Sequence, residues 1–387
     1  MADAPLENGP RGYGRIDPKR RRLLGTLAGI ALAGVGQSGQ SFAASAQTLT
    51  GQTLAGQNPV GQTAGQAASF PTDISVIIAG PESGATDNWA RSILAALAKT
   101  LPPGSRVHGV PTGAADGVTG ANQFEARTAP DGASLLVVPG AAALAWLVGD
   151  PRAQFDVGHW VPVLAGTCSG VVALRGGQAA LTPGRKIRIA TASPMGPELA
   201  ALLAVDLLGA QPVPVTGLMD AAATRAALAQ GSVDGVLLRG RRLSDQITAT
   251  ADLGLQPVFS LGNLNEDGKI MRDPRFPDVP EFSELLNAYR PAALSGRLFD
   301  GWRAITAATR LEFAVVLPRL TPAAMVAHWR RSASEAATTL TNPASEQMIR
   351  VLSGAAGAVE IAAMAVESAT LLELRRWLGA RLDWYPT

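Results

Sequence analysis

The stretch from Gly80 to Asp87 has the residue types and spacing to bind an anion. A β-branched run at 74–78 ends at Gly80-Pro81, a turn with Gly and Ser follows, and Thr86 or Asp87 is expected to begin a helix. A strand, a glycine turn and a capped helix direct unpaired backbone N–H groups and the positive end of the helix dipole toward the space above the turn. The stretch therefore predicts one wall of a small-molecule site, and we expect the rest of the chain to supply a second wall.

Residues that could carry out catalysis do not form a recognisable constellation. His108, His159 and His328 are far apart in sequence and lack the spacing of metal ligands. G-x-S-x-G, Walker and H-E-x-x-H motifs do not occur, and the G-x-G-x-x-G at 34–39 has no strand before it. Cys168 lies in an apolar stretch that favours a buried structural thiol over a nucleophile. The sequence predicts no catalytic residue, no metal site and no cofactor, with a hydrolytic enzyme as the less favoured alternative.

The basic charge of the chain is concentrated at its N-terminus. Of 387 residues, 47% are apolar and 17% are charged, which suits two domains with ample cores. The formal net charge is +2, but the first 46 residues hold six Lys and Arg against three Asp and Glu, so the rest has a net charge of −1. Without a basic excess in the remainder, we expect no nucleic-acid partner.

The first 46 residues have the pattern of an export signal. The basic cluster Lys19 to Arg22 precedes an apolar run at 23–35, and Ala44-Ser45-Ala46 offers small residues for cleavage near Ala46. The run is too short to span a membrane, and the consecutive arginines also suit a twin-arginine signal. Because Cys168 is the only cysteine, no intrachain disulfide can form. We predict a signal peptide at 1–46 and a periplasmic protein.

Residues 47–69 predict a flexible linker between the signal and the folded part. Gly-Gln recurs from positions 51, 56, 61 and 65 among Thr, Ala and Asn, with few large apolar residues to bury. A short structural repeat is the alternative, but so few short units would form only a marginal solenoid.

From Phe70 onward, strand patterns alternate with helical patterns. The expected strands lie at 74–79, 107–111, 134–139, 161–174 with interruptions at Gly166 and Gly170, 186–190, 213–215, 233–238 and 313–317. Helices are expected after the first turn, around Phe124, at 199–208 and 221–229, and from 318 to Leu378. This alternation predicts an α/β fold with mostly parallel sheets.

Several short motifs, in their order and spacing, resemble those of one protein family. They are Pro81 with Gly84–Asp87, Ala129–Gly132 followed by Leu135-Leu136, Val213–Val215 with Gly217, Gly231–Asp234, Phe276–Pro280 with Glu284, and Thr321-Pro322 with Asn342-Pro343. Across about 74–352 the chain resembles the periplasmic solute receptors of tripartite tricarboxylate-type transporters, also called Bordetella-uptake-type receptors.

The resemblance implies an α/β, two-lobed periplasmic binding protein of type II, which closes around its ligand like a Venus flytrap. Lobe 1 would comprise 70–168 and 312–387, and lobe 2 would comprise 169–311. The resemblance also implies a small organic carboxylate as ligand, held largely by backbone amides, and a pair of membrane permease subunits as partners. We expect a monomer and not an enzyme.

The candidate ligand-binding residues lie in two sets of loops, one in each expected lobe. The lobe 1 set comprises Pro81, Ser83, Gly84, Ala85, Thr86, Asp87, Gly140 and Ala141. The lobe 2 set comprises Ser193, Met195, Gly196, Thr216 and Gly217. For Asp87, capping its own helix is an equal expectation, and Trp89 is expected to pack and not to stack on a ligand.

Some residues depart from the family pattern and change the expected ligand. Glu82 and Ser83 stand where the family has small residues or Gly, and Glu82 is expected on the solvated rim. Residues 140–143 stand where the family offers Ser, Thr or Asn, and 215–217 replace Tyr-Lys-Gly. With fewer side-chain donors, we expect a smaller or less charged ligand than a di- or tricarboxylate. A ligand-sensing interaction protein with an altered or lost transport role is the alternative.

Overall fold

The computed structural model of the chain describes residues 70–346 and 348–385. The predicted signal peptide at 1–46 and the predicted linker at 47–69 lie outside the described residues. Among the described residues, no helix combines the length and the apolar composition that crossing a bilayer requires.

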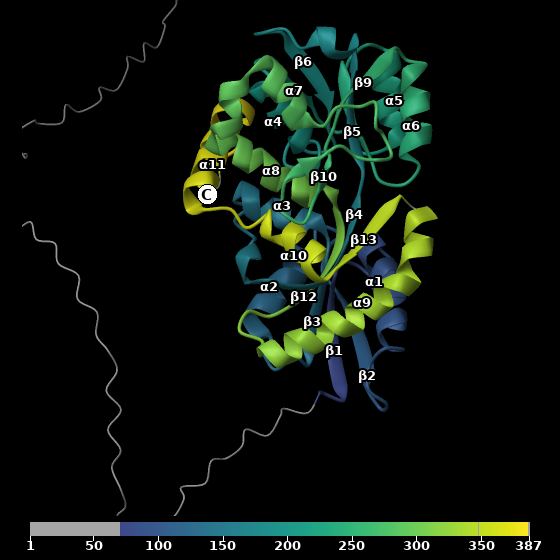
Figure 1. Cartoon of the computed structure of the whole chain (residues 1–387). Helices are drawn as coiled ribbons and strands as arrows, with labels where there is room; N and C mark the ends of the chain where they lie inside the picture. The colour runs from purple at the N-terminus through teal and green to yellow at the C-terminus, as the bar shows by residue number, and fades with distance from the viewer. Residues whose placement is uncertain (1–69, 347, 386–387) are drawn as a thin grey trace, which may run out of the picture. The chain divides into compact units, whose positions relative to one another are not determined.

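The first of two large sheets has six strands in the order β13-β4-β12-β3-β1-β2 (Figure 1). The strands are β1 (Asp73–Ala79), β2 (Arg106–Thr112), β3 (Ser134–Val138), β4 (Val161–Cys168), β12 (Leu311–Leu317) and β13 (Ile349–Ser353). Strands β2, β1 and β3 are parallel, whereas β12 is antiparallel to β3 and to β4, and β13 is antiparallel to β4. We call this sheet and its helices lobe 1.

The second sheet has five strands in the order β7-β6-β8-β5-β9, and we call it and its helices lobe 2. Its strands are β5 (Gly170–Arg175), β6 (Lys186–Ala190), β7 (Gln211–Val215), β8 (Gly235–Arg239) and β9 (Leu255–Ser260), and a separate two-stranded ribbon is formed by β10 (Asn263–Leu264) and β11 (Ile270–Met271). Strands β7, β6 and β8 are parallel, but β5 is antiparallel to β8 and β9. Both sheets are therefore mixed where mostly parallel sheets were predicted, because the chain leaves lobe 1 along β4 and returns along β12 in the opposite direction.

The helices cover both sheets. They are α1 (Ala85–Leu97), α2 (Val118–Arg127), α3 (Gly140–Val148), α4 (Leu199–Leu207), α5 (Ala221–Ala229), α6 (Leu243–Ala251), α7 (Phe282–Tyr289), α8 (Arg297–Arg310), α9 (Ala323–Glu346), α10 (Gly354–Ala362) and α11 (Ser368–Leu382). The predicted helix from 318 to Leu378 is wrong at β13, because Ile349 and Leu352 are buried in a strand that pairs with β4.

Strand alternation assigns the apolar side chains of lobe 1 to two separate layers. In β12, Phe313, Val315 and Leu317 join the core beneath α1 and α9. Ala314 and Val316 point to the other face and join the core that contains α2, α3 and α10 residues. Strand β12 is thus buried on both faces, which is why it reads as a nearly continuous apolar run.

A polar cluster fixes the point where the chain crosses from β4 to β5. Ser169, the single residue between these strands, donates a short hydrogen bond to the buried carboxylate of Asp273. Arg275 Nη1 donates to Ser169 Oγ at 3.3 Å and to the carbonyl oxygen of Met348 at 2.7 Å. The crossing is therefore held by residues that precede α7 and by the residue that precedes β13.

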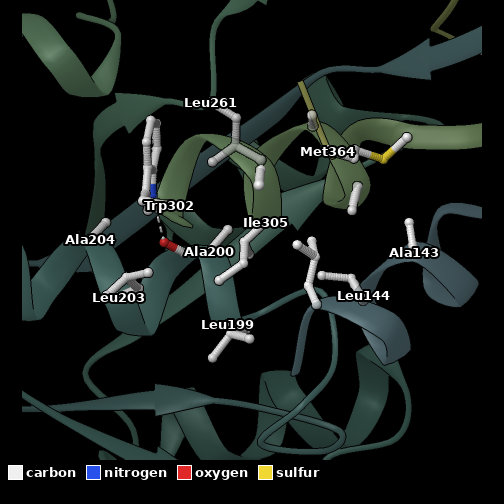
Figure 2. Close-up of a cluster of buried hydrophobic side chains, with 14 of the residues drawn as sticks. Ala143, Leu144, Leu199, Ala200, Leu203, Ala204, Leu261, Trp302, Ile305 and Met364 are labelled. Atoms are coloured by element: carbon white, nitrogen blue, oxygen red, sulfur yellow. Dashed lines mark hydrogen bonds between the residues drawn. The ribbon is translucent and has the colours of Figure 1, made fainter. Parts of the chain in front are cut away.

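One apolar core continues from lobe 1 into lobe 2 through α8. Helix α8 packs against α3, α11 and α4. Figure 2 shows Trp302 and Ile305 of α8 beside Leu199 and Ala200 of α4 and Leu144 of α3. The indole Nε1 of Trp302 donates to the carbonyl oxygen of Ala200 at 3.0 Å. The two lobes thus share a buried seam in addition to their covalent crossings.

We predict that Trp302→Ala destabilises the protein by about 3–5 kcal/mol, because it empties a fully buried site in this seam and removes the indole N–H that donates to the Ala200 carbonyl. The free energy of unfolding is measured by urea titration. Met219→Ala is the control, since Met219 is 75% exposed and its truncation is expected to change stability by less than about 0.5 kcal/mol. A loss below 1 kcal/mol for Trp302→Ala would contradict a continuous seam.

Candidate ligand-binding site

A cavity of about 430 Å³ lies where the two lobes meet beside the first helix, and we call it the α1 cavity. Its volume falls in the range of small-molecule sites, roughly 300–1,000 Å³. It is lined by Ala85, Asn88, Trp89 and Ser92 of α1, by Arg241 after β8, by Glu312 of β12 and by Ile349 of β13. Residues from lobe 1 and from lobe 2 therefore face the same space.

The α1 wall forms because one face of the helix is directed at the cavity. Ala85, Asn88, Trp89 and Ser92 are spaced three and four residues apart, so they lie on one side of the helix. The ring of Trp89 packs on Phe313 of β12 with centroids 5.0 Å apart, which fixes the orientation of the indole. Trp89 was expected to pack only, and it both packs and lines the cavity.

The first predicted loop adopts a strained turn that starts the helix earlier than expected. Ser83 has a φ of 60°, a left-handed conformation that is uncommon for a residue with a side chain. Gly84 is the N-cap, so the prediction that Thr86 or Asp87 begins the helix is wrong. Asp87 instead lies inside the first turn and its Oδ2 accepts from the Ser83 backbone N at 2.8 Å. A carboxylate three residues inside the helix can reach back to the preceding turn, as in a capping box.

Asp87 serves the helix start and does not line the cavity. It is fully buried, and Arg91 donates to its Oδ2 at 3.0 Å. Its Oδ1 is buried without a hydrogen-bond partner among the described residues. Thr86 is also buried, while Pro81 and Ser83 are exposed. Within the predicted first-loop set, Ala85 is the residue that lines the α1 cavity.

The predicted residues at the start of α3 are covered by another helix. Gly140 is buried, and a Cβ atom at this position would lie 2.0 Å from the carbonyl oxygen of Ala308 and 2.6 Å from that of Leu311. Only glycine permits this close approach of α3 to the end of α8. Ala141 is half-buried. The structure therefore places Gly140 against backbone where a ligand contact was predicted.

The predicted lobe 2 residues lie in two loops near the start of α4. Ser193 is exposed and its Oγ accepts from the Met195 backbone N at 3.4 Å, while the Met195 side chain packs on the core. Thr216 and Gly217 are exposed, and the Gly217 backbone N donates to the Ala192 carbonyl oxygen at 3.3 Å. Gly196 lies beside the carboxylate of Glu198. None of these five predicted residues lines the α1 cavity.

Behind the cavity, charged side chains from both lobes form one cluster. Arg239 Nη2, at the end of β8, donates to Glu312 Oε1 at 2.7 Å and lies 3.5 Å from the sulfur of Cys168. The predicted burial of Cys168 is confirmed, and burial raises the pKa of its thiol to about 11. The thiol therefore stays protonated at neutral pH and is a poor nucleophile.

Glu198, at the N-cap of α4, adds a second carboxylate to this region. Burial raises the pKa of Glu198, and the positive charge of Arg239 partly opposes this effect. Glu198 Oε2 and Arg239 Nε are both buried without a hydrogen-bond partner in the described part of the chain. Among the residues that the structure describes, no group of three or more His, Cys, Asp or Glu side chains is placed to bind a metal ion.

Sequence reasoning missed six of the seven lining residues. A helical-face count along α1 could have found Asn88, Trp89 and Ser92, because they repeat with the spacing of Ala85. Arg241, Glu312 and Ile349 come from distant segments and carry no local motif. Arg241 follows β8 of lobe 2 and Glu312 lies in β12 of lobe 1, so only the junction of the two lobes brings them to the same cavity.

The chain forms two lobes, each built on a mixed sheet with covering helices. Crossing strands join the lobes, and a cavity lies at their junction. This arrangement is the fold of a two-lobed periplasmic binding protein. No protein-family model matches the chain. No curated protein matches it either.

Solved structures do match. A TctC solute-binding protein from Polaromonas is similar with a TM-score of 0.59 and 15% identity, over 80% of this chain and 98% of that one. The periplasmic binding protein BugD matches with a TM-score of 0.46 and 17% identity, over 80% and 97%. A protein of R. palustris solved with adipate matches with a TM-score of 0.47 and 14% identity, over 79% and 97%. The first likeness confirms the predicted fold class and agrees, at the level of fold, with the family resemblance.

Glu198 gives the protein a predictable pH dependence. Because its pKa is raised in the native state, the native protein binds this proton more tightly than the unfolded chain. Stability is therefore lost as the pH rises from the ordinary value of 4.5 through the raised native pKa. Glu198→Gln lacks this titration, so we expect its free energy of unfolding to increase relative to wild type as the pH rises over that interval.

Urea unfolding at several pH values between 4.5 and 8 measures this difference. Glu335→Gln on α9 is the matched control, because Glu335 is exposed. A Glu198→Gln difference that stays constant with pH would rule out a raised pKa at Glu198.

Proposed function

We propose that the protein is a periplasmic solute-binding receptor that captures a small organic carboxylate or a related metabolite between its lobes. The observation that carries the proposal is the α1 cavity, which both lobes line at the point where the chain crosses between them. A site at such a junction couples ligand contacts to the relative position of the lobes. The fold likeness to a solute-binding protein supports the same class of function.

The cavity offers several weak contacts in place of one strong one. A micromolar ligand requires about −8 kcal/mol of binding free energy. An anion at a helix N-terminus gains only about 0.3–1 kcal/mol, or up to about 2 kcal/mol when partly buried. The start of α1 at Ala85 is therefore insufficient alone, and Arg241, Asn88, Ser92 and Trp89 supply the further contacts. Binding without chemistry is favoured by the protonated thiol of Cys168.

We further propose that the receptor is exported to the periplasm, acts as a monomer and delivers its solute to membrane permease subunits. The export signal predicted at 1–46 and the family resemblance support this assignment. The ligand class implied by the family resemblance makes organic acids the first compounds to test.

Thermal-shift titration of the full chain with a panel of organic acids and amino acids tests the receptor function. We expect a melting-temperature rise that saturates with at least one compound, without turnover of that compound. Ser92→Tyr fills the α1 cavity from an exposed position on α1 and is expected to weaken this binding at least about tenfold, or about 1.4 kcal/mol.

Ser334→Tyr is the matched control, because Ser334 is an exposed serine of α9 that does not line the α1 cavity. Equal binding by wild type and Ser92→Tyr would place the ligand elsewhere. Turnover of the bound compound would show that the protein is an enzyme and not a receptor.

A further inference from the structure

We propose that the ligand of the α1 cavity is a small zwitterion, which carries one ammonium group and one carboxylate, and not a dicarboxylate. The proposal rests on the receptor function and names the ligand class of the same site. It follows from the two charged side chains of opposite sign that line the cavity, Glu312 from lobe 1 and Arg241 from lobe 2.

Glu312 gives the cavity a fixed negative wall. Its side chain is 23% exposed, and its Oε1 is held 2.7 Å from Arg239 Nη2. A carboxylate has about four acceptor sites on its two oxygens, so one bond to Arg239 leaves capacity for a ligand donor. Trp89 lines the same space, and an indole ring attracts a nearby cation. An ammonium group suits this wall.

Arg241 and the start of α1 give the cavity a positive region. A guanidinium has five N–H donors, so Arg241 can donate to a ligand carboxylate while it keeps another partner. Ala85 is the first residue of α1, and the N–H groups of a first helical turn have no acceptor within the helix. Asn88 and Ser92 lie further along the same face and add amide and hydroxyl groups. A carboxylate suits this region.

A dicarboxylate does not match this charge pattern. Its second carboxylate would share the cavity with Glu312, and like charges in a partly buried site repel more strongly than they do in water. Glu312 cannot turn away easily, because Arg239 holds it from the lobe 2 side. Replacing the second carboxylate by an ammonium group converts the repulsion into attraction.

The experiment compares the two ligand classes on the full chain. The common amino acids and the C3–C6 aliphatic dicarboxylates are titrated by thermal shift and then by calorimetry at pH 7. We expect the tightest ligand to be an amino acid, bound about tenfold or more tightly than the same acid without its amino group, since a hydrogen bond to a charged group has about this effect.

The outcomes separate this inference from the receptor function. A dicarboxylate that binds more tightly than every amino acid overturns the zwitterion assignment but leaves the receptor in place. No saturable binding by either class overturns both.

Two variants test which side chain binds which charged group of the ligand. Glu312→Gln keeps the side-chain shape and an acceptor for Arg239 but removes the negative charge. It is expected to weaken the zwitterion about tenfold while leaving the deaminated acid unchanged or tighter. Arg241→Gln is expected to weaken both compounds, because both have the carboxylate.

Glu335→Gln, a charge removal at an exposed position on α9, is the matched control and should change neither affinity. An equal loss of both compounds in Glu312→Gln would show that Glu312 acts only on the structure, and it would overturn the assignment of the ammonium group to this wall.

Discussion

The relative position of the two lobes depends on the packing of α8 between them. Most of its residues from Gly301 to Arg310 are buried, and small side chains such as Ala304 and Ala308 let α3 and α4 approach closely. Each large apolar side chain in the seam, such as Ile305 or Leu144, gains roughly 1.5–3 kcal/mol from burial. A wide opening of the lobes at this side would expose several of them. The packing of α8 therefore favours one arrangement of the two lobes at this seam.

The end of α8 also determines where Glu312 stands. Arg310 is buried, its Nη2 lies 2.6 Å from Glu360 Oε1 of α10, and its Nη1 donates to the carbonyl oxygens of Leu261 and Gly262. A buried charge that loses its partner costs about 3–5 kcal/mol, so this network strongly favours a single arrangement. It fixes the junction of α8 and β12, and Glu312 follows two residues later. The position of Glu312 in the cavity wall thus depends on a buried ion pair that does not itself line the cavity.

Sequence patterns predicted the fold better than the site, for a physical reason. Strands such as β1 and β3 and helices such as α5 are encoded locally by apolar spacing and turn residues, and they lie within a few residues of their predicted bounds. The start of α1 was misplaced because Asp87 has the chemistry of an N-cap but acts from inside the first turn. The pair of Arg241 and Glu312 could not be predicted, since only the crossing of the chain between sheets brings them together. The lobe boundaries and the two loop sets stay predictions.

In the proposed site, Glu312 determines the choice of ligand, and Glu82 of the first loop does not. Glu82 is exposed, its side chain lies 3.8 Å from Arg91, and solvent screens its charge. Glu312 carries the same charge but lies in the cavity wall, partly shielded from water and held by Arg239. Coulomb interactions strengthen as the effective dielectric constant falls, so the inner carboxylate dominates. The fold can therefore be retained at low sequence identity while the ligand preference changes, because β12 and the loop after β8 can exchange charges without altering the core.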